Sequence, residues 1–319
     1  MSALAAAEHR STGAFSHEAV LYAGPEGFLD GTLPFIREGV AAGQPTLVMV
    51  GPAKIELLRG ALNGEARDVE FVDMAEVGRN PARIIPAWRE FADAHQDSGR
   101  PLRGIGEPIW AGRTPAELVE CQRHESLLNL AFAGAPAFRL LCPYDTAALP
   151  APVIAEAHAS HPIVLDRGVA RQSSGYLGAG AAAAPFDAPL PAPATRPRTL
   201  AFRAGTLDAV RQFISQHAAE AGLGTGRAAD LVLAVNELAT NSLLHGGGEG
   251  ELLFWSDGDV AIWEVRDRGG IDDPLAGREC PGIDRVGGHG LWLVNQLCDL
   301  VQVRSFADGG AVRVHMRRR

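Results

Sequence analysis

The second half of the chain carries a helix-period pattern of apolar and polar positions. Four residues that this pattern would bury recur at i, i+4, i+7 and i+11: Leu231, Val235, Leu238 and Ser242. Glu237, Asn241 and His245 recur at i, i+4 and i+8, so they form a neighbouring polar stripe on the same helix. Taken alone, these three residues fit a solvated helix face equally well.

A strand and a second helix follow this pattern along the chain. Residues 260–265 alternate as a half-buried strand does, and Asp267 and Gly269 come directly after it. Gly288 and Gly290 open an apolar helix. The segment between Asp267 and Gly288 is polar and contains proline and glycine, which suits a lid over a bound ligand.

The first half alternates strand and helix patterns. Strands are predicted at residues 46–50, 69–74, 102–108 and 138–144. Helices are predicted at residues 27–42, 81–95, 115–133 and 152–158. This alternation predicts an α/β domain with a mainly parallel sheet.

A change in composition separates the two halves. Residues 172–197 are rich in alanine, proline and glycine, which predicts an extended interdomain linker. We therefore expect a disordered N-terminus over residues 1–15, a first domain over 16–171 and a second domain over 198–319.

Composition narrows the functional classes. With 319 residues, 46% of them hydrophobic, the chain can bury a sizeable core, and a net charge of −9 argues against a direct nucleic-acid surface. The four cysteines form no CxxC pair, which is typical of reduced thiols in a cytosolic protein. No signal peptide or membrane-spanning segment is recognised, so we expect a cytoplasmic protein with no membrane partner.

The second half offers the groups that a magnesium–nucleotide complex needs. The Asn241 amide oxygen is a hard ligand suited to Mg²⁺, and the Glu237 carboxylate can accept the proton of an attacking hydroxyl. Asp267 can accept a hydrogen bond from an exocyclic amine such as that of adenine, and Gly269 lets a flat base approach the backbone. The glycines that open the second helix leave N–H groups free for phosphate oxygens.

The first half has fewer chemical signals. Asp73 and Glu107 lie at the ends of predicted parallel strands, where ligands bind in such sheets, and Trp110 lies near the second. Glu120 and His124 lie one helical turn apart and suit either a metal or, as we favour, a hydrogen bond along the helix face. These five residues are our candidate sensory pocket.

A phosphate-binding loop is not expected in the first half. The strand predicted at residues 46–50 is followed by Gly51-Pro52-Ala53-Lys54, which has no full glycine–lysine–serine/threonine loop. ATP hydrolysis by this half is therefore not expected.

The second half resembles the GHKL ATPase fold of histidine kinases, gyrase B and RsbW-type anti-sigma factor kinases. The matching residues are Glu237 and Asn241 in the first motif, Asp267 and Gly269 in the second, and Gly288, Gly290 and Leu291 in the third. The resemblance implies an α/β sandwich that binds ATP and Mg²⁺. Arg285, in the predicted lid, is a candidate for offsetting the γ-phosphate charge.

The first half resembles the MEDS domain, a sensory module related to the RecA/KaiC-like ATPases but without their P-loop. The matching stretches are His17 to Tyr22, Asp73 to Glu76, Arg103 to Trp110 and Glu120 to Glu125. The resemblance implies that this half receives a signal, with the small-molecule ligand unidentified.

The two-domain arrangement is similar to the RsbA-type anti-sigma regulatory proteins. That resemblance implies a cytoplasmic regulator that binds a sigma factor, phosphorylates a serine or threonine of an anti-anti-sigma (STAS-type) partner, or does both. A sensor histidine kinase, with His124 as its only phosphoacceptor candidate, and a non-catalytic ATP-dependent binding module stay open as alternatives. The family often dimerises through its ATPase domain, which leaves a homodimer open.

Overall fold

The chain divides into two compact units, residues 1–184 and 185–319. The computed structural model describes residues 14–135, 137–178, 188–281 and 288–318. Most of the predicted N-terminal disorder, over residues 1–13, and Arg285 lie outside the described residues. Each unit is described by itself below.

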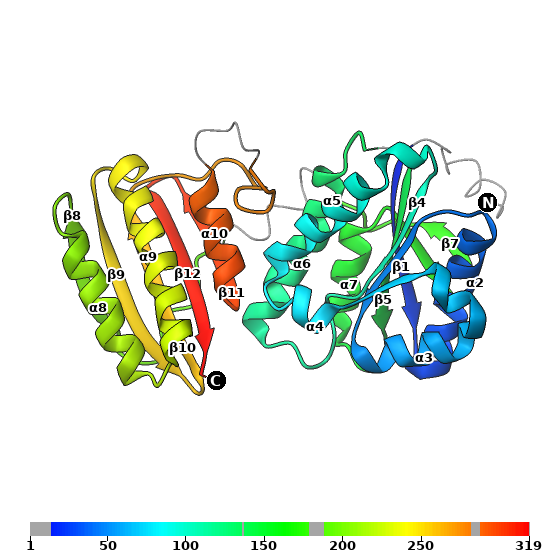
Figure 1. Cartoon of the computed structure of the whole chain (residues 1–319), viewed down its shortest axis with the longest axis horizontal. Helices are drawn as coiled ribbons and strands as arrows, with labels where there is room; N and C mark the ends of the chain where they lie inside the picture. The colour runs from blue at the N-terminus through cyan, green and yellow to red at the C-terminus, as the bar shows by residue number, and fades with distance from the viewer. Residues whose placement is uncertain (1–13, 136, 179–187, 282–287, 319) are drawn as a thin grey trace. The chain divides into compact units, whose positions relative to one another are not determined.

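The first unit is built on a seven-stranded sheet with the strand order β3-β2-β4-β5-β1-β6-β7 (Figure 1). The strands are β1 (Phe15–Tyr22), β2 (Thr46–Val50), β3 (Glu70–Asp73), β4 (Leu102–Gly106), β5 (Phe138–Asp145), β6 (Ile163–Asp166) and β7 (Val169–Gln172). Every pairing is parallel except that of β6 with β7. The prediction of a mainly parallel sheet is confirmed.

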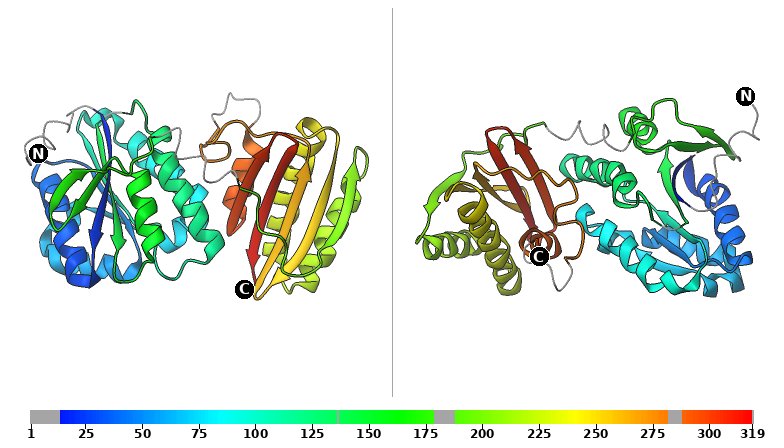
Figure 2. Two further views of the ribbon diagram at one scale, coloured as in Figure 1. Left: turned by 180° about the vertical axis from the view of Figure 1, so that it is seen from behind. Right: turned by 90° about the horizontal axis from the view of Figure 1, so that it is seen from above.

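Helices cover both faces of this sheet (Figures 1 and 2). They are α2 (Gly24–Ala41), α3 (Pro52–Leu62), α4 (Met74–Val77), α5 (Ile84–Ala94), α6 (Pro115–Ala131) and α7 (Ala151–Ser160), with 3-10 turns at Asn63–Asp68, Pro81–Arg83 and Gln96–Ser98. Val20, Val48 and Leu141 pack with α2 and α3 in one apolar cluster. Because side chains alternate along a strand, the neighbours of these residues face the opposite layer, formed by α5, α6 and α7.

The interior strand β1 was not predicted, because it buries polar side chains. His17 and Glu18 are both buried, and they interrupt the apolar pattern on which strand prediction depends. Glu18 is compensated by Arg139 on β5, whose guanidinium nitrogens lie 3.0 and 3.2 Å from the two carboxylate oxygens. The strand is therefore stabilised by a partner that lies far away in the sequence.

A second buried carboxylate lies at the carboxyl end of the sheet. The Lys54 ammonium lies 2.5 and 2.6 Å from the two Glu107 oxygens and 2.6 Å from the Tyr22 hydroxyl, which itself donates to Glu107. Burial raises the pKa of Glu107, and Lys54 opposes that rise. Lys54 is therefore occupied by an internal ion pair.

The second unit is a sheet covered by helices on one face (Figure 2, left). The five antiparallel strands follow the order β11-β12-β10-β9-β8. Their bounds are β8 (Arg198–Arg203), β9 (Glu249–Asp257), β10 (Val260–Asp267), β11 (Leu300–Phe306) and β12 (Gly309–Arg317), and the helices are α8 (Leu207–Glu220), α9 (Thr225–His245) and α10 (His289–Leu297). The predicted α/β sandwich is confirmed.

Alternation along β10 separates the two faces of this sheet. Ala261, Trp263 and Val265 belong to the core beneath the helices. Glu264 faces the other side, where Arg313 pairs with it at 2.6 Å and also donates to the Pro191 carbonyl. Part of the alanine/proline segment therefore lies against the uncovered face of the sheet. In the described part of the chain, no helix combines the length and the hydropathy needed to span a bilayer.

Replacing Lys54 tests the buried ion pair. Lys54→Met leaves Glu107 without its cation, and we expect the free energy of unfolding to fall by about 2–4 kcal/mol, since Lys54 is itself partly exposed. Arg59→Met, which removes an exposed pair with Glu56 from the same helix, should cost under about 1 kcal/mol. Chemical denaturation measures both, and Lys54→Met/Glu107→Gln should recover most of the loss. Equal effects of the two single variants would refute the account.

His315 makes the second unit sensitive to acid. Burial, followed by the charges of Arg313 and Arg317, lowers the pKa of His315 from 6.5 to about 3. Between these values the unfolded chain binds a proton that the folded chain does not, so stability is complete above about pH 6.5 and falls as the pH drops, by up to about 1.4 kcal/mol per pH unit. We expect His315→Gln, which can still hydrogen-bond Gln302, to lose this part of the slope in denaturation measured from pH 7 to pH 4. An unchanged slope would contradict the assignment.

Candidate functional site

Helix α9 carries the two predicted stripes on adjacent faces. The apolar stripe is buried as predicted: Leu231, Val235, Leu238 and Ser242. Asn241 and His245 line a pocket. The helix ends at His245, and the N–H of its C-cap residue Gly246 donates to the Ser242 carbonyl at 2.8 Å. The polar stripe is therefore directed at a cavity over at least two of its three positions.

Asp267 lies at the end of β10, directly against the last turn of α9. The Ser242 hydroxyl donates to one of its carboxylate oxygens, and the Gly269 N–H donates to the other at 2.7 Å. A Cβ atom on Gly246 would lie 2.4 Å from the Asp267 carboxyl carbon. The absence of a side chain at Gly246 is thus what allows the helix end and the strand end to meet.

Gly269 and Gly309 allow close backbone contacts around Asp267. A Cβ on Gly269 would lie 2.9 Å from the His245 carbonyl oxygen, and one on Gly309 would lie 2.2 Å from the Asp267 carbonyl oxygen. Gly309 also has a φ of +146°, which L side chains rarely adopt. The backbone of β12 therefore runs close beside Asp267.

Helix α10 begins opposite the polar stripe of α9. Gly288 is its N-cap, in the left-handed conformation with a φ of +86°. A Cβ on Gly290 would lie 3.1 Å from the Asn241 amide nitrogen and 3.2 Å from a Glu237 carboxylate oxygen. Glu237 and Asn241 therefore both face the first turn of α10.

These elements enclose a pocket of about 340 Å³. Its walls include six of the residues predicted from sequence: Asn241, Asp267, Gly269, Gly288, Gly290 and Leu291. Glu237 is at the Gly290 contact instead of in the pocket wall, and Arg285 lies outside the described residues. The structure thus brings the three sequence motifs to one cavity.

Further residues that were not among the predicted site residues also line the pocket. They come from the segment after β10 and from the start of β12: Gly270, Ile271, Asp272, Asp273, Ala276, Gly310, Ala311 and Val312. The β12 residues reach the pocket because Asp267 pairs with Gly310 in the sheet. The glycine pair that begins β12 was the available signal, but strand pairing is needed to place it.

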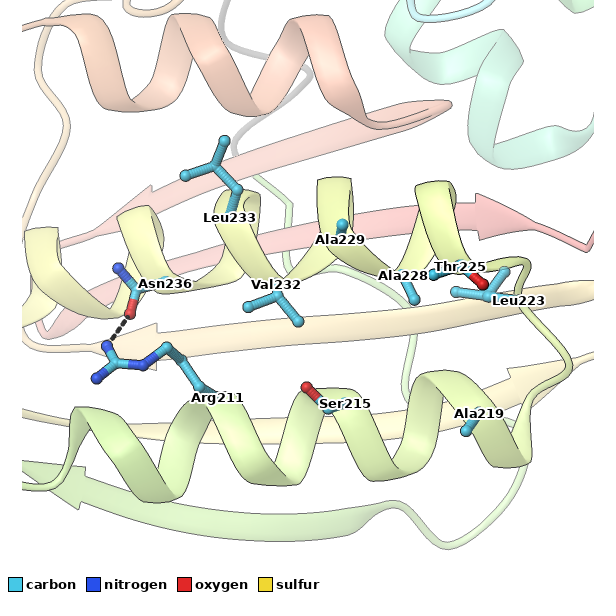
Figure 3. A pocket seen from close by; sticks show the side chains of 10 residues that line it. All are labelled: Arg211, Ser215, Ala219, Leu223, Thr225, Ala228, Ala229, Val232, Leu233 and Asn236. Atoms are coloured by element: carbon cyan, nitrogen blue, oxygen red, sulfur yellow. Dashed lines mark hydrogen bonds between the residues drawn. The ribbon is translucent and has the colours of Figure 1, made fainter.

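A second hollow lies between α8 and α9, away from these motifs (Figure 3). Its lining is largely apolar, and Arg211 donates to Asn236 at 2.9 Å across it. It contains none of the predicted site residues, so we assign it no chemistry.

The candidate sensory residues of the first unit do not share one role. The Asp73 carboxylate caps α4 by accepting from the Ala75 N–H at 2.8 Å, and Glu107 pairs with Lys54. Trp110 is covered by the Arg113 guanidinium, 3.8 Å from the ring centroid. Their polar groups are thus used by contacts within the unit.

The other two candidates lie within α6. Glu120 and His124 are both buried, as is Cys121 between them. The Cys121 thiol donates to the Pro108 carbonyl at 3.3 Å, and burial raises its pKa to about 12. Cys121 is therefore a protonated thiol near neutral pH. The sensory pocket formed by the five candidate residues stays a prediction.

Each unit matches a known family model. Residues 16–162 match the model of the MEDS domain, the methanogen/methylotroph DcmR sensory domain, and residues 200–317 match the histidine kinase-like ATPase domain. No curated protein is significantly similar to the chain. A similar solved structure holds the RsbU and RsbW domains of Rv1364c from Mycobacterium tuberculosis, at 21% identity and a TM-score of 0.30; the match covers 39% of this chain and 32% of that one.

Adding one methyl group at the contact between α9 and β10 tests the geometry of the site. We expect Gly246→Ala to push Asp267 aside and to lower the free energy of unfolding by about 1–3 kcal/mol, because the new Cβ has no space. Gly226→Ala, on the first turn of the same helix with nothing within 4 Å, is the matched control and should be neutral or slightly stabilising. Thermal unfolding of both variants provides the measurement. A Gly246→Ala protein as stable as the control would show that the contact is not tight.

Proposed function

We propose that this chain, in which a MEDS domain precedes a histidine kinase-like ATPase domain, is a signalling regulator that binds Mg-ATP in its second unit. The observation that supports this most is the convergence of Asn241, Asp267 and the start of α10 on one pocket. These groups come from three separate elements, and each suits a different part of the nucleotide.

Asp267 suits the adenine base. Ser242 and Gly269 both donate to its carboxylate, which keeps it an acceptor. Its remaining lone pairs would accept from the exocyclic amine of adenine, whereas guanine presents a carbonyl oxygen at that position. The base therefore lies at the end of β10 in this proposal.

The first turn of α10 suits the phosphates. Its free N–H groups and the helix dipole favour anions, and Gly288 and Gly290 keep the approach clear of side chains. Mg²⁺ neutralises phosphate charge when it is bound, and the Asn241 amide oxygen is the hard ligand that would hold it. Glu237 faces the same turn, so its carboxylate is near the position of the terminal phosphate.

This placement supports phosphoryl transfer as the reaction. A serine or threonine hydroxyl of a protein partner would attack the γ-phosphorus while the bond to the bridging oxygen of ADP breaks. Glu237 would accept the hydroxyl proton as general base. We propose an anti-anti-sigma (STAS-type) protein as the phosphorylated partner, a sigma factor as the second partner, and the cytoplasm, where ATP is available, as the compartment.

The two alternatives differ in what they need from the chain. A sensor histidine kinase would have to expose His124, which is 1% exposed within α6, so its phosphorylation would require that helix to open. A non-catalytic module needs only the pocket. Only the proposal predicts that labelled phosphate moves from ATP to a serine or threonine hydroxyl of a partner. The absence of such transfer would favour one of the two alternatives.

Substitutions on α9 test the assigned roles. We expect Asn241→Ala to weaken Mg-ATP binding at least tenfold in isothermal titration. Asn236→Ala is the control on the same helix; Asn236 bonds to Arg211 of α8, so this variant should bind as wild type does. Glu237→Gln should bind Mg-ATP within a few-fold of wild type but lower phosphotransfer by about 10²–10⁴-fold, the usual contribution of a general base. Intact phosphotransfer in Glu237→Gln would remove the base assignment, and no ATP binding by wild type would remove the whole proposal.

A further inference from the structure

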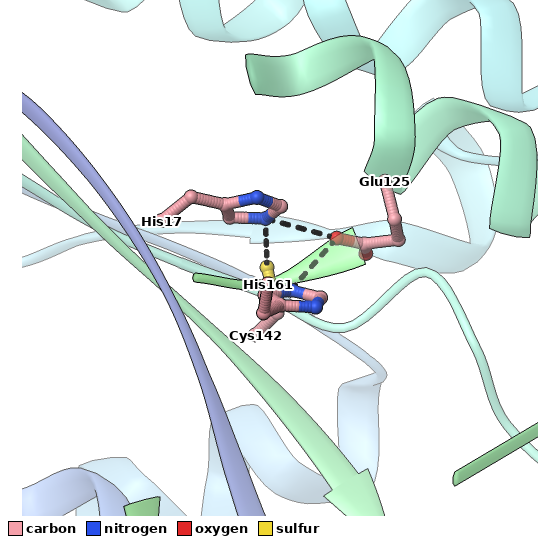
Figure 4. A group of neighbouring side chains, drawn as sticks. All are labelled: His17, Glu125, Cys142 and His161. Carbon is pink, nitrogen blue, oxygen red and sulfur yellow. Dashed lines mark hydrogen bonds and ion pairs between the residues drawn. The ribbon is translucent and has the colours of Figure 1, made fainter. Parts of the chain in front are cut away.

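Four potential metal ligands meet inside the first unit, far apart in the sequence (Figure 4). They are His17 on β1, Glu125 on α6, Cys142 on β5 and His161 directly after α7. All four are buried, and one ligand atom of each lies within 4.8 Å of the others. None belongs to the candidate sensory residues or to the ATP pocket.

The fold explains how these residues converge. Strands β1 and β5 are parallel neighbours with Ala19 paired to Cys142, so His17 and Cys142 point to the same face of the sheet. Helix α6 covers this face and brings Glu125, and the end of α7 brings His161. The site is thus sandwiched between the sheet and two helices, not placed at the strand ends where sequence reasoning looked for a ligand.

The hydrogen bonds of His17 fix which ring nitrogen carries a proton. The Asn129 amide nitrogen donates to the Ser160 carbonyl at 2.8 Å, which turns the amide oxygen toward His17 Nδ1, 3.3 Å away. An amide oxygen only accepts, so Nδ1 carries the hydrogen. In the neutral ring, the Nε2 lone pair then faces Glu125 Oε2 at 3.1 Å and the Cys142 sulfur at 3.4 Å.

His161 is arranged in the same way. Its Nδ1 lies 2.8 Å from the Ala157 carbonyl oxygen, which requires a hydrogen on Nδ1. Its Nε2 lies 3.3 Å from Glu125 Oε2 and forms no hydrogen bond, and Glu125 Oε1 likewise has no partner among the described residues. A bond from the far nitrogen to a carbonyl is also how metal-binding histidines are usually oriented.

Two imidazole lone pairs and a carboxylate oxygen therefore face one another in a buried space, which favours a positive charge between them. A metal ion satisfies all of the acceptors at once. Tetrahedral bonds of about 2.0–2.3 Å place neighbouring ligand atoms about 3.3–3.6 Å apart. Three of the distances between the ligand atoms here are 3.1, 3.3 and 3.4 Å, and all four atoms lie within 4.8 Å of one another.

We propose that His17, Glu125, Cys142 and His161 form a tetrahedral binding site for a zinc-type divalent cation. Two imidazoles, a thiolate and a carboxylate are ligands that Zn²⁺ takes in proteins, and four protein ligands make a closed site that stabilises or senses instead of catalysing. Binding replaces the proton of the Cys142 thiol, which leaves to solvent. The loaded site is then electrically neutral, because one thiolate and one carboxylate balance the ion.

Metal content and ligand spectra of the full chain test this site. We expect about one Zn²⁺ per chain after reconstitution of chelator-treated protein, and a thiolate-to-cobalt charge-transfer band when Co²⁺ is used instead. Cys142→Ser should lose the band, and His161→Ala should weaken Zn²⁺ binding by 10-fold or more. Cys121→Ser, a buried thiol of the same unit outside the cluster, is the matched control and should keep both properties.

A structural measurement on wild type covers the case in which a variant does not fold. X-ray absorption of the zinc-loaded chain should show one sulfur and three nitrogen or oxygen ligands. Sub-stoichiometric zinc in wild type, a first shell without sulfur, or an undiminished cobalt band in folded Cys142→Ser would each overturn the proposal and leave a proton as the charge that the four residues share. Since the site is remote in sequence from the ATP pocket, loss of ATP binding alone would not affect this outcome.

Discussion

The second unit depends on one close contact, where the last turn of α9 meets the end of β10. Ser242 donates to Asp267 across this contact, and Gly246 has no side chain that would hold the two elements apart. The contact places Asp267 in the pocket wall together with Asn241, the residue before Ser242 on the helix. Gly290 then lets α10 begin against Asn241, so two glycine contacts set the width of the cavity.

The pocket was largely predictable because its chemistry follows local spacing. Glu237 and Asn241 are one helical turn apart, so their common direction follows from the helix period alone. Ser242 shows the limit of this reasoning: it was assigned to the buried stripe, and it is buried, but its hydroxyl also orients Asp267. The contribution of β12 required the pairing of Asp267 with Gly310, which no local pattern encodes.

In the first unit, the alternation of strands and helices gave the fold class, but the polar interior could not be predicted. Strand β1 was missed because the partners that compensate His17 and Glu18 come from other elements. On α6, helical spacing drew attention to Glu120 and His124, whereas the four-residue cluster uses Glu125, the next position along. Two residues one helical turn apart point to the same side of the helix. Which side of α6 meets further potential ligands depends on the tertiary fold.

Glu125 differs from the other buried carboxylates in the groups that it faces. Five of them face a cation: Glu18 with Arg139, Glu107 with Lys54, Glu120 with Arg123, Glu264 with Arg313 and Asp299 with Arg227. Glu117 lies in the first turn of α6 in a capping box, where the helix dipole favours negative charge. Glu125 lies within the helix and, among the described residues, faces two imidazoles and a thiol. Because an isolated buried carboxylate is costly and five of the other six face a cation, this comparison favours a cation beside Glu125 as well, and the proposed divalent metal would be shared by all four residues of the cluster.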